Sequence, residues 1–156
     1  MNSNTISRNE FMKLAGTSVL AACAGSIVFG GCSAVATAPL APTDSYRREA
    51  DLVIVSLSAL PDLQSVGGAV RLELGNGSRE RLLVVHSAEQ IYTTYANRCT
   101  HNGKELDYRH DQHRVQCISG KSHFNLAGKI TKGPAGGPLK IYPNQLDGDE
   151  LWISLA

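Results

Sequence analysis

Two short segments of the sequence place cysteine and histidine at spacings that suit a metal centre. Cys99 and His101 lie two residues apart in the segment CTHNG, and Cys117 begins the segment CISGKSHF. Thiolate sulfur and imidazole nitrogen are ligands of iron–sulfur clusters and of zinc. A third segment, residues 133–139, is rich in glycine and proline. The pattern predicts two loops that hold a redox metal and a third loop that covers them.

These segments resemble the cluster-binding loops of Rieske iron–sulfur proteins. CTHNG is similar to the first loop of that family, and CISGKSHF to the second, which normally reads Cys-x-x-His-Gly-Ser-x-Phe/Tyr; KGPAGGPLKIY is similar to the proline loop. In Rieske centres, two cysteines bind one iron of a [2Fe-2S] cluster and two histidines bind the other. The resemblance implies that Cys99, His101 and Cys117 are ligands, and that Ser122 donates a hydrogen bond to the cluster.

Gly120 stands where the second histidine of the family is expected. His123 is a candidate replacement as the fourth ligand, because a turn at Gly120 and Lys121 can bring residues three apart close together. Its position also matches a variable residue of the family, and on an extended chain it points away from the neighbouring Phe124. Two possibilities follow: His123 binds the cluster, or the outer iron lacks one protein ligand and is open to water or an outside ligand.

Two other uses of the same residues compete with the cluster. Cys99 and Cys117 are the only cysteines after residue 32, and an exported protein could join them in a disulfide bond. Alternatively, Cys99, His101, Cys117 and His123 could bind a single zinc ion. We favour the cluster, because His101 accompanies Cys99 in a loop turned by glycine, and because Cys-x-His is tighter than the usual zinc spacing.

Residues 1–38 are predicted to be a signal or anchor segment. SRNEFMK resembles the twin-arginine export motif with Asn9 in place of the second arginine, and no charged residue occurs between Leu14 and Thr43. The sequences that end at Cys23 and Cys32 resemble lipoprotein cleavage sites, Ala-x-Ala sequences near residue 36 suit ordinary signal peptidase, and the apolar run could also remain as an anchor. We expect an exported protein, in the periplasm or on the outer face of the membrane, attached through this segment or a lipid.

The rest of the chain shows the alternation of apolar residues that predicts strands. Residues 39–50 are predicted to be an extended linker, and residues 51–156 a Rieske-like domain without a sustained helical period. We predict an all-β fold, an antiparallel β sandwich or barrel, with a small cluster-binding subdomain at about residues 97–128 inserted into it. Strands are expected at residues 52–55, 69–74, 81–85, 90–95, 129–131, 139–142 and 150–155.

Charge and composition narrow the function. The chain has 15 basic and 14 acidic residues and a formal net charge of +1, which gives no electrostatic argument for binding nucleic acid. No Ser-His-Asp order, phosphate-binding loop or paired carboxylates indicate catalysis. We therefore predict an exported one-electron carrier with a Rieske-type [2Fe-2S] cluster, working with a redox partner protein or a respiratory or oxidase complex. The alternative is a cluster-free interaction or structural subunit that has lost a ligand at Gly120.

Overall fold

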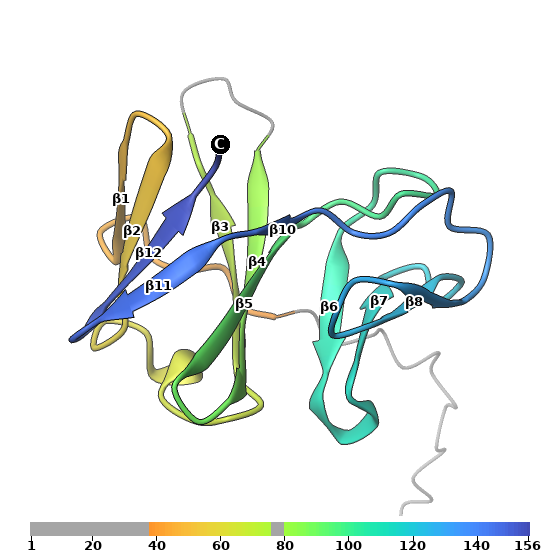
Figure 1. The fold of residues 1–156 in the computed structure, drawn as a ribbon, viewed down its shortest axis with the longest axis horizontal. Coiled ribbons are helices and arrows are strands. Elements are labelled where there is room, and N and C mark those ends of the chain that lie inside the picture. The colour runs from red at the N-terminus through yellow and green to blue at the C-terminus, as the bar shows by residue number, and fades with distance from the viewer. Residues whose placement is uncertain (1–37, 76–79) are drawn as a thin grey trace, which may run out of the picture. The chain divides into compact units, whose positions relative to one another are not determined.

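The computed structural model describes residues 38–75 and 80–156 (Figure 1). The predicted leader up to residue 37, with Cys23 and Cys32, and most of the turn after Gly75 lie outside the described residues. The described chain forms three antiparallel sheets of four strands each and two short 3-10 turns, η1 (Pro61–Leu63) and η2 (His110–Gln112). None of its helices is long and apolar enough to cross a membrane. The predicted all-β fold is confirmed.

Two of the sheets share one apolar core and form what we call the base. The first has the strand order β1-β2-β12-β11 and the second β10-β5-β4-β3. Their strands are β1 (Tyr46–Glu49), β2 (Leu52–Ser56), β3 (Ala69–Glu73), β4 (Arg81–Ala88), β5 (Ile91–Ala96), β10 (Ile141–Tyr142), β11 (Asn144–Asp147) and β12 (Glu150–Ser154). Successive side chains of a strand point to opposite faces, so alternate residues meet in this core. They include Val53, Val55, Val70, Leu72, Leu82, Val84, Leu151 and Ile153.

The third sheet belongs to an insertion between β5 and β10, residues 97–140, which we call the loop subdomain. Its order is β6-β7-β8-β9, formed by β6 (Leu106–Arg109), β7 (Arg114–Cys117), β8 (His123–Asn125) and β9 (Ile130–Lys132). Tyr95 of β5 lies opposite Ile141 of β10, so the chain returns to the strand it left, and this sheet lies to one side of the base (Figure 1). The predicted insertion is confirmed, and it extends beyond residue 128.

Strand β4 connects the base to the loop subdomain, because both of its faces are buried. Leu82 and Val84 face the core of the base, whereas Leu83 and Val85 face a second core. A continuous apolar run is typical of a strand buried on both sides. The loops that carry the cysteines therefore rest on a central strand of the base. The second core also contains Tyr95, Cys99, Leu106, Val115, Cys117, Phe124 and Leu139.

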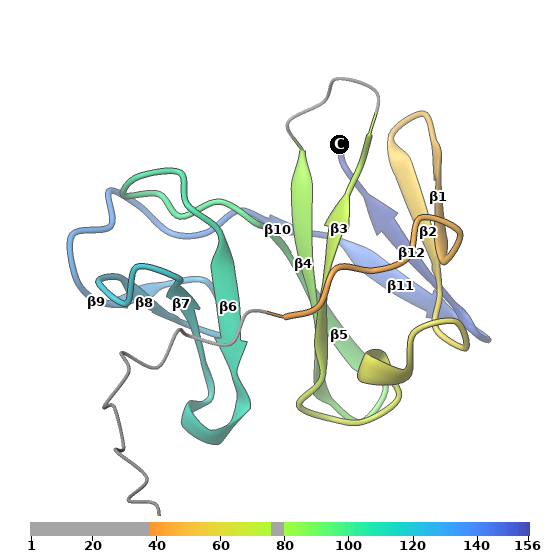
Figure 2. The ribbon, with the colours of Figure 1, turned by 180° about the vertical axis from the view of Figure 1, so that it is seen from behind.

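Residues 39–50 were expected to be a linker, but the structure incorporates them into the base (Figure 2). Strand β1 pairs with β2, and Arg71 exchanges backbone hydrogen bonds of 2.8 and 2.9 Å with Pro39 and Ala41. Most side chains of β1 are exposed, so the segment lacks the apolar alternation from which strands are predicted. Backbone pairing at the edge of a sheet forms this strand, and pairing of that kind leaves no apolar signal.

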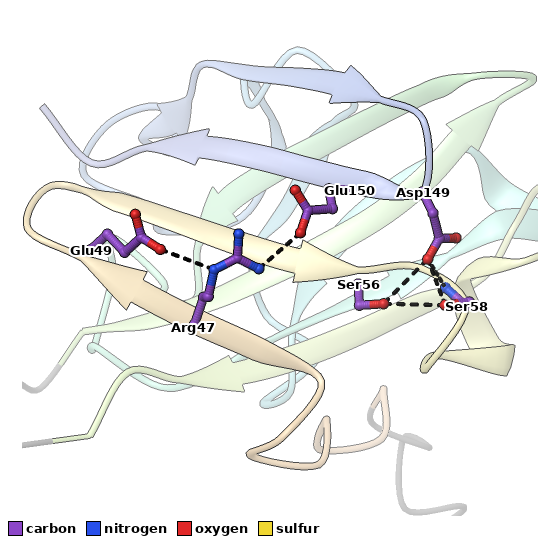
Figure 3. Close-up of polar contacts among 6 residues, drawn as sticks. All are labelled: Arg47, Glu49, Ser56, Ser58, Asp149 and Glu150. Atoms are coloured by element: carbon purple, nitrogen blue, oxygen red, sulfur yellow. Dashed lines mark hydrogen bonds and ion pairs between the residues drawn. The ribbon is translucent and has the colours of Figure 1, made fainter.

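Polar contacts connect exposed side chains of the first sheet and of the turn that precedes β12 (Figure 3). Arg47 donates to Glu49 at 3.0 Å and to Glu150 at 2.8 Å. Asp149 accepts hydrogen bonds from the hydroxyls of Ser58 at 2.5 Å and Ser56 at 3.2 Å. The bond from Ser58 is the main reason that the pKa of Asp149 lies below its usual range. Exposed contacts of this kind contribute little stability, so the apolar core dominates the base.

Candidate metal centre

The thiols of Cys99 and Cys117 lie side by side beneath the loops. Cys99 lies in the loop that follows β5, and Cys117 is the last residue of β7; both are buried and free of a disulfide bond. Burial raises the pKa of Cys99, and the adjacent Cys117 thiol raises it further, whereas the backbone of His101 and the hydroxyl of Ser122 lower it. The fold thus brings together two of the predicted ligands, and close sulfur pairs of this kind can share a metal.

The first loop closes on itself through backbone hydrogen bonds. Cys99 N–H donates to Lys104 O at 2.7 Å, and Gly103 N–H donates to Cys99 O at 2.8 Å. Gly103 has a φ of +71°, a left-handed conformation that favours glycine. His101 is exposed and lines a hollow of about 450 Å³. The imidazole is therefore presented from the solvent side. The hollow is lined by Arg98, Cys99, Thr100, His101, Asn102 and Gly103.

The second loop turns tightly and leaves open space at Gly120. Gly120 N–H donates to Cys117 O at 2.7 Å, and Cys117 N–H donates to Ser122 O at 2.9 Å. Gly120 has a φ of +71°, and no atom lies within 4 Å of the place where a Cβ would stand. The position expected to hold a histidine thus lacks a side chain, and no neighbouring residue fills the space.

Two polar side chains that the sequence did not single out hold the Cys117 sulfur. Ser119 Oγ donates to Cys117 Sγ at 3.0 Å, and the Cys117 thiol faces Asn102 Oδ1 at 3.7 Å. Asn102 Oδ1 also accepts from the backbone N–H of Lys104 at 3.1 Å. Asn102 therefore connects the two loops. Its role depends on a contact across fifteen residues, which motif spacing does not reveal.

The environment of the Ser122 hydroxyl bears on whether the site suits a cluster. Its side chain is fully buried, and its hydroxyl has no hydrogen-bond partner among the described residues, although it is near enough to Cys99 to lower the pKa of that thiol. A buried polar group without a partner costs about 1–3 kcal/mol. A hydrogen-bond acceptor beside Cys99, such as a sulfide or thiolate, would satisfy it. The predicted position of Ser122 at the cluster fits this geometry.

His123 lies on the other face of its strand. It pairs with Gln116, whereas Phe124 pairs with Val115 and packs in the same core as both cysteines. Burial lowers the pKa of His123, and the positive charge of Arg114 lowers it further. The structure does not bring His123 to the thiols. Across residues 38–75 and 80–156, no group of three or more Cys, His, Asp or Glu side chains converges in a metal-binding arrangement.

The glycine- and proline-rich segment covers both loops, as expected from the sequence. Thr100 of the first loop donates through Oγ1 to Gly137 O at 2.7 Å. A Cβ on Gly133 would lie 1.8 Å from the carbonyl oxygen of Lys121 in the second loop. Only glycine permits this approach of two backbones, so the third loop fixes the positions of the other two.

Comparison with known proteins identifies the family. The sequence model of the Rieske [2Fe-2S] domain matches residues 61–143. The chain belongs to this family. Among curated proteins it is 34% identical over 58 residues to cytochrome b6-f complex iron-sulfur subunit 2 of Nostoc sp., which covers 37% of this chain and 33% of the relative. It is 25% identical over 138 residues to the cytochrome b6-f complex iron-sulfur subunit of Chlorobaculum thiosulfatiphilum, which covers 83% of this chain and 72% of that protein.

A solved structure supports the fold. The ferredoxin of carbazole 1,9a-dioxygenase from Nocardioides aromaticivorans IC177 aligns with a TM-score of 0.53 at 16% identity, covering 72% of this chain and 99% of that one. The match to the Nostoc relative spans about a third of that protein. The predicted family and fold are thereby confirmed, and the cofactor of this family is a [2Fe-2S] cluster. The described donors fit the cysteine half of such a cluster. For the histidine half, His101 lies at the hollow beside Cys99 but does not converge with both thiols.

Proposed function

We propose that this Rieske protein is a one-electron carrier. The observation that supports this most directly is the buried pair of free thiols, Cys99 and Cys117, with the unpartnered hydroxyl of Ser122 beside it. The two cysteines would hold one iron of a [2Fe-2S] cluster and His101 would bind the other. The cluster supplies reversible one-electron chemistry when bound. Ser122 would donate to sulfur, and hydrogen bonds of this kind raise the reduction potential of a cluster.

Gly120 gives the site its distinguishing property in this proposal. His123 lies on the opposite face of β8, so we assign it no place among the ligands. The outer iron would have one protein ligand instead of two, and a position near Gly120 would be open to water or a small outside ligand. Metal sites depend on ligand number and on loop geometry together. We therefore expect a cluster that is lost more easily than one with two histidines.

The decisive experiment measures iron, acid-labile sulfide and the reduced-state electron paramagnetic resonance spectrum of anaerobically purified protein. Cys117→Ser and His101→Ala should each lower iron and sulfide at least tenfold, because each removes a ligand. His113→Ala is the matched control, since His113 is exposed directly after the η2 turn, and His123→Ala should also change little. Loss of the cluster with His123→Ala alone would contradict this ligand set.

The second candidate function is a cluster-free interaction subunit. It is favoured by Gly120 and by the absence of three converging metal ligands among residues 38–75 and 80–156. Protein that is folded by circular dichroism, yet holds no iron or sulfide after reconstitution under anaerobic conditions, would support this function over electron transfer.

We also propose that the protein is exported and attached to a membrane, where it serves a redox enzyme complex. The charge-free run after Lys13 and the cysteines at positions 23 and 32 support export and attachment. Two relatives are named as iron-sulfur subunits of cytochrome b6-f complexes, which supports a complex as the partner. Cell fractionation tests this, and a full-length product in the cytoplasm would contradict it.

A further inference from the structure

The near-zero net charge of the chain conceals a division of charge between the two regions. The loop subdomain contains eight basic and three acidic residues. The described part of the base contains four basic and ten acidic residues. The basic residues of the loop subdomain are Arg98, Lys104, Arg109, Arg114, Lys121, Lys129, Lys132 and Lys140, and its acidic residues are Glu105, Asp107 and Asp111. One region is therefore strongly positive and the other strongly negative.

The positive charges of the loop subdomain are exposed, whereas its negative charges are mostly used internally. Glu105 bonds two arginines of the base, and Asp107 is buried beside Arg109. By contrast, every arginine in the described base is ion-paired. Six cations of the loop subdomain are exposed and have no ion-pair partner among the described residues. They are Arg98, Lys104, Lys121, Lys129, Lys132 and Lys140.

Three of these cations belong to the loops that hold the thiols. The guanidinium of Arg98 lies over Gly103 in the first loop, with Nε 3.3 Å from where a Cβ would stand. The carbonyl of Lys104 binds the backbone N–H of Cys99. The carbonyl of Lys121 contacts Gly133, next to Lys132. Three of the exposed cations are thus carried by the loop segments that hold the thiols.

We propose that the loop subdomain is a docking surface for an acidic face of the redox partner protein. This deepens the proposed electron-transfer function and rests on it. Complementary charge steers two proteins together and can raise the association rate by a factor of about 10–1,000 at low salt. The negative base would repel the same acidic face, so the partner would arrive with the thiol-bearing loops toward it.

An acidic protein accounts for this arrangement better than an anionic membrane. Lipid headgroups would attract the same lysines, but a membrane laid against these loops would cover the hollow beside Cys99 and His101. The phospholipid headgroups that would meet these lysines also carry no redox group. Cations on the redox loops are therefore suited to binding an electron-transfer partner. A membrane bound to the same loops would block the approach of that partner.

Binding to immobilised polyglutamate at low ionic strength tests the proposal, with the full-length protein in a non-ionic detergent. Lys104→Gln combined with Lys121→Gln should weaken binding about tenfold, because screened surface attraction depends on local charge. The matched control is Gln90→Glu combined with Gln145→Glu, which lowers the net charge equally but at exposed positions of the base. The control should change binding less than about twofold.

Several outcomes would overturn the docking surface. They are equal weakening in both variants, no binding of the native protein, or tighter lysine-dependent binding to phosphatidylcholine vesicles that contain phosphatidylglycerol than to polyglutamate. Iron and sulfide are measured on the same samples. Lysine-dependent binding by protein that cannot hold a cluster would contradict electron transfer but keep the docking surface for an acidic partner. Loss of lysine dependence in cluster-loaded protein would contradict the docking surface alone.

Discussion

In the base, Val53, Leu82 and Leu151 belong to a core of apolar side chains from five strands, β2, β3, β4, β10 and β12. In the loop subdomain, Phe124 and Val115 belong to a core that also contains two thiols. One side of this core is formed by β4 of the base. The antiparallel strands of the two regions are therefore stabilised in different ways. We expect the base to fold without a metal, because its core consists of apolar side chains. The loop subdomain has two buried thiols in its core and an open hollow beside Cys99 and His101, so we expect a bound cluster to stabilise it.

The first prediction tests the independence of the base. Leu151→Ala should lower the free energy of unfolding by about 3 kcal/mol, the usual cost of removing a fully buried leucine side chain, and the loss should be the same with and without iron. Urea unfolding followed by the fluorescence of Trp152, the single tryptophan, measures it. Val66→Ala is the control, because Val66 is 44% exposed. A loss that depends on iron would show that the base relies on the cluster.

The second prediction concerns the connection between the two regions. Glu105 accepts hydrogen bonds from Arg71 at 2.5 Å and Arg81 at 2.7 Å, so it joins β3 and β4 to the first loop. Glu105→Gln should cost about 1–2 kcal/mol, because the side chain is mostly buried and charged hydrogen bonds are lost. Glu49→Gln is the matched control: its ion pair with Arg47 is exposed and should contribute almost nothing. Equal losses in both variants would contradict a special connecting role.

The third prediction restores the family's ligand. Gly120→His, with Lys121→Gly to ease the turn, should slow the loss of iron from the loaded protein about tenfold, because no atom blocks a side chain there. In metal-free protein the change should cost about 1–2 kcal/mol, since left-handed backbone is unfavourable for residues other than glycine. Gly148→His is the control, with a φ of +58° and equally open space in the base. If both variants lose iron at the native rate, the second loop does not face the outer iron.

Part of this architecture could be predicted from the sequence, and the missing part has physical causes. The strands around Val53, Leu82 and Leu151 were predictable because burial of one face imposes alternation. The Cys99 and Cys117 loops were predictable because ligand chemistry restricts residue type and spacing. Strand β1 was missed because its side chains are exposed.

The sequence analysis also did not predict β6, β7, β8 and β11, and it missed several long-range contacts. Asn102 on the Cys117 sulfur and Glu105 between two arginines join segments distant in sequence, and neither follows a periodic pattern. The division of charge was invisible because opposite excesses cancel in the total. Segment-by-segment charge, taken with the predicted insertion, could have revealed it.

The last prediction, with the smallest expected effect, concerns Asp107 of β6, which connects β6 to the first described residue of the base by a hydrogen bond. Its Oδ1 accepts from the backbone N–H of Ala38 at 3.0 Å. Burial raises the pKa of Asp107, while the charges of Arg109 and Arg71 and the backbone N–H groups of Ala38 and Tyr108 oppose that rise. Between the unfolded-state pKa and this higher folded-state pKa, the folded protein binds a proton that the unfolded chain releases.

The sign of the pH effect follows from this difference. Because the folded state binds more protons in that window, the free energy of unfolding should fall as pH rises through it. Asp107→Asn should flatten this part of the profile while keeping the oxygen that accepts from Ala38, with an effect smaller than that of Glu105→Gln. Urea midpoints of metal-free protein from about pH 4 to pH 7 measure it. Asp111→Asn, at an exposed position of the η2 turn, should leave the slope unchanged; a slope that survives Asp107→Asn would assign the pH dependence to another group.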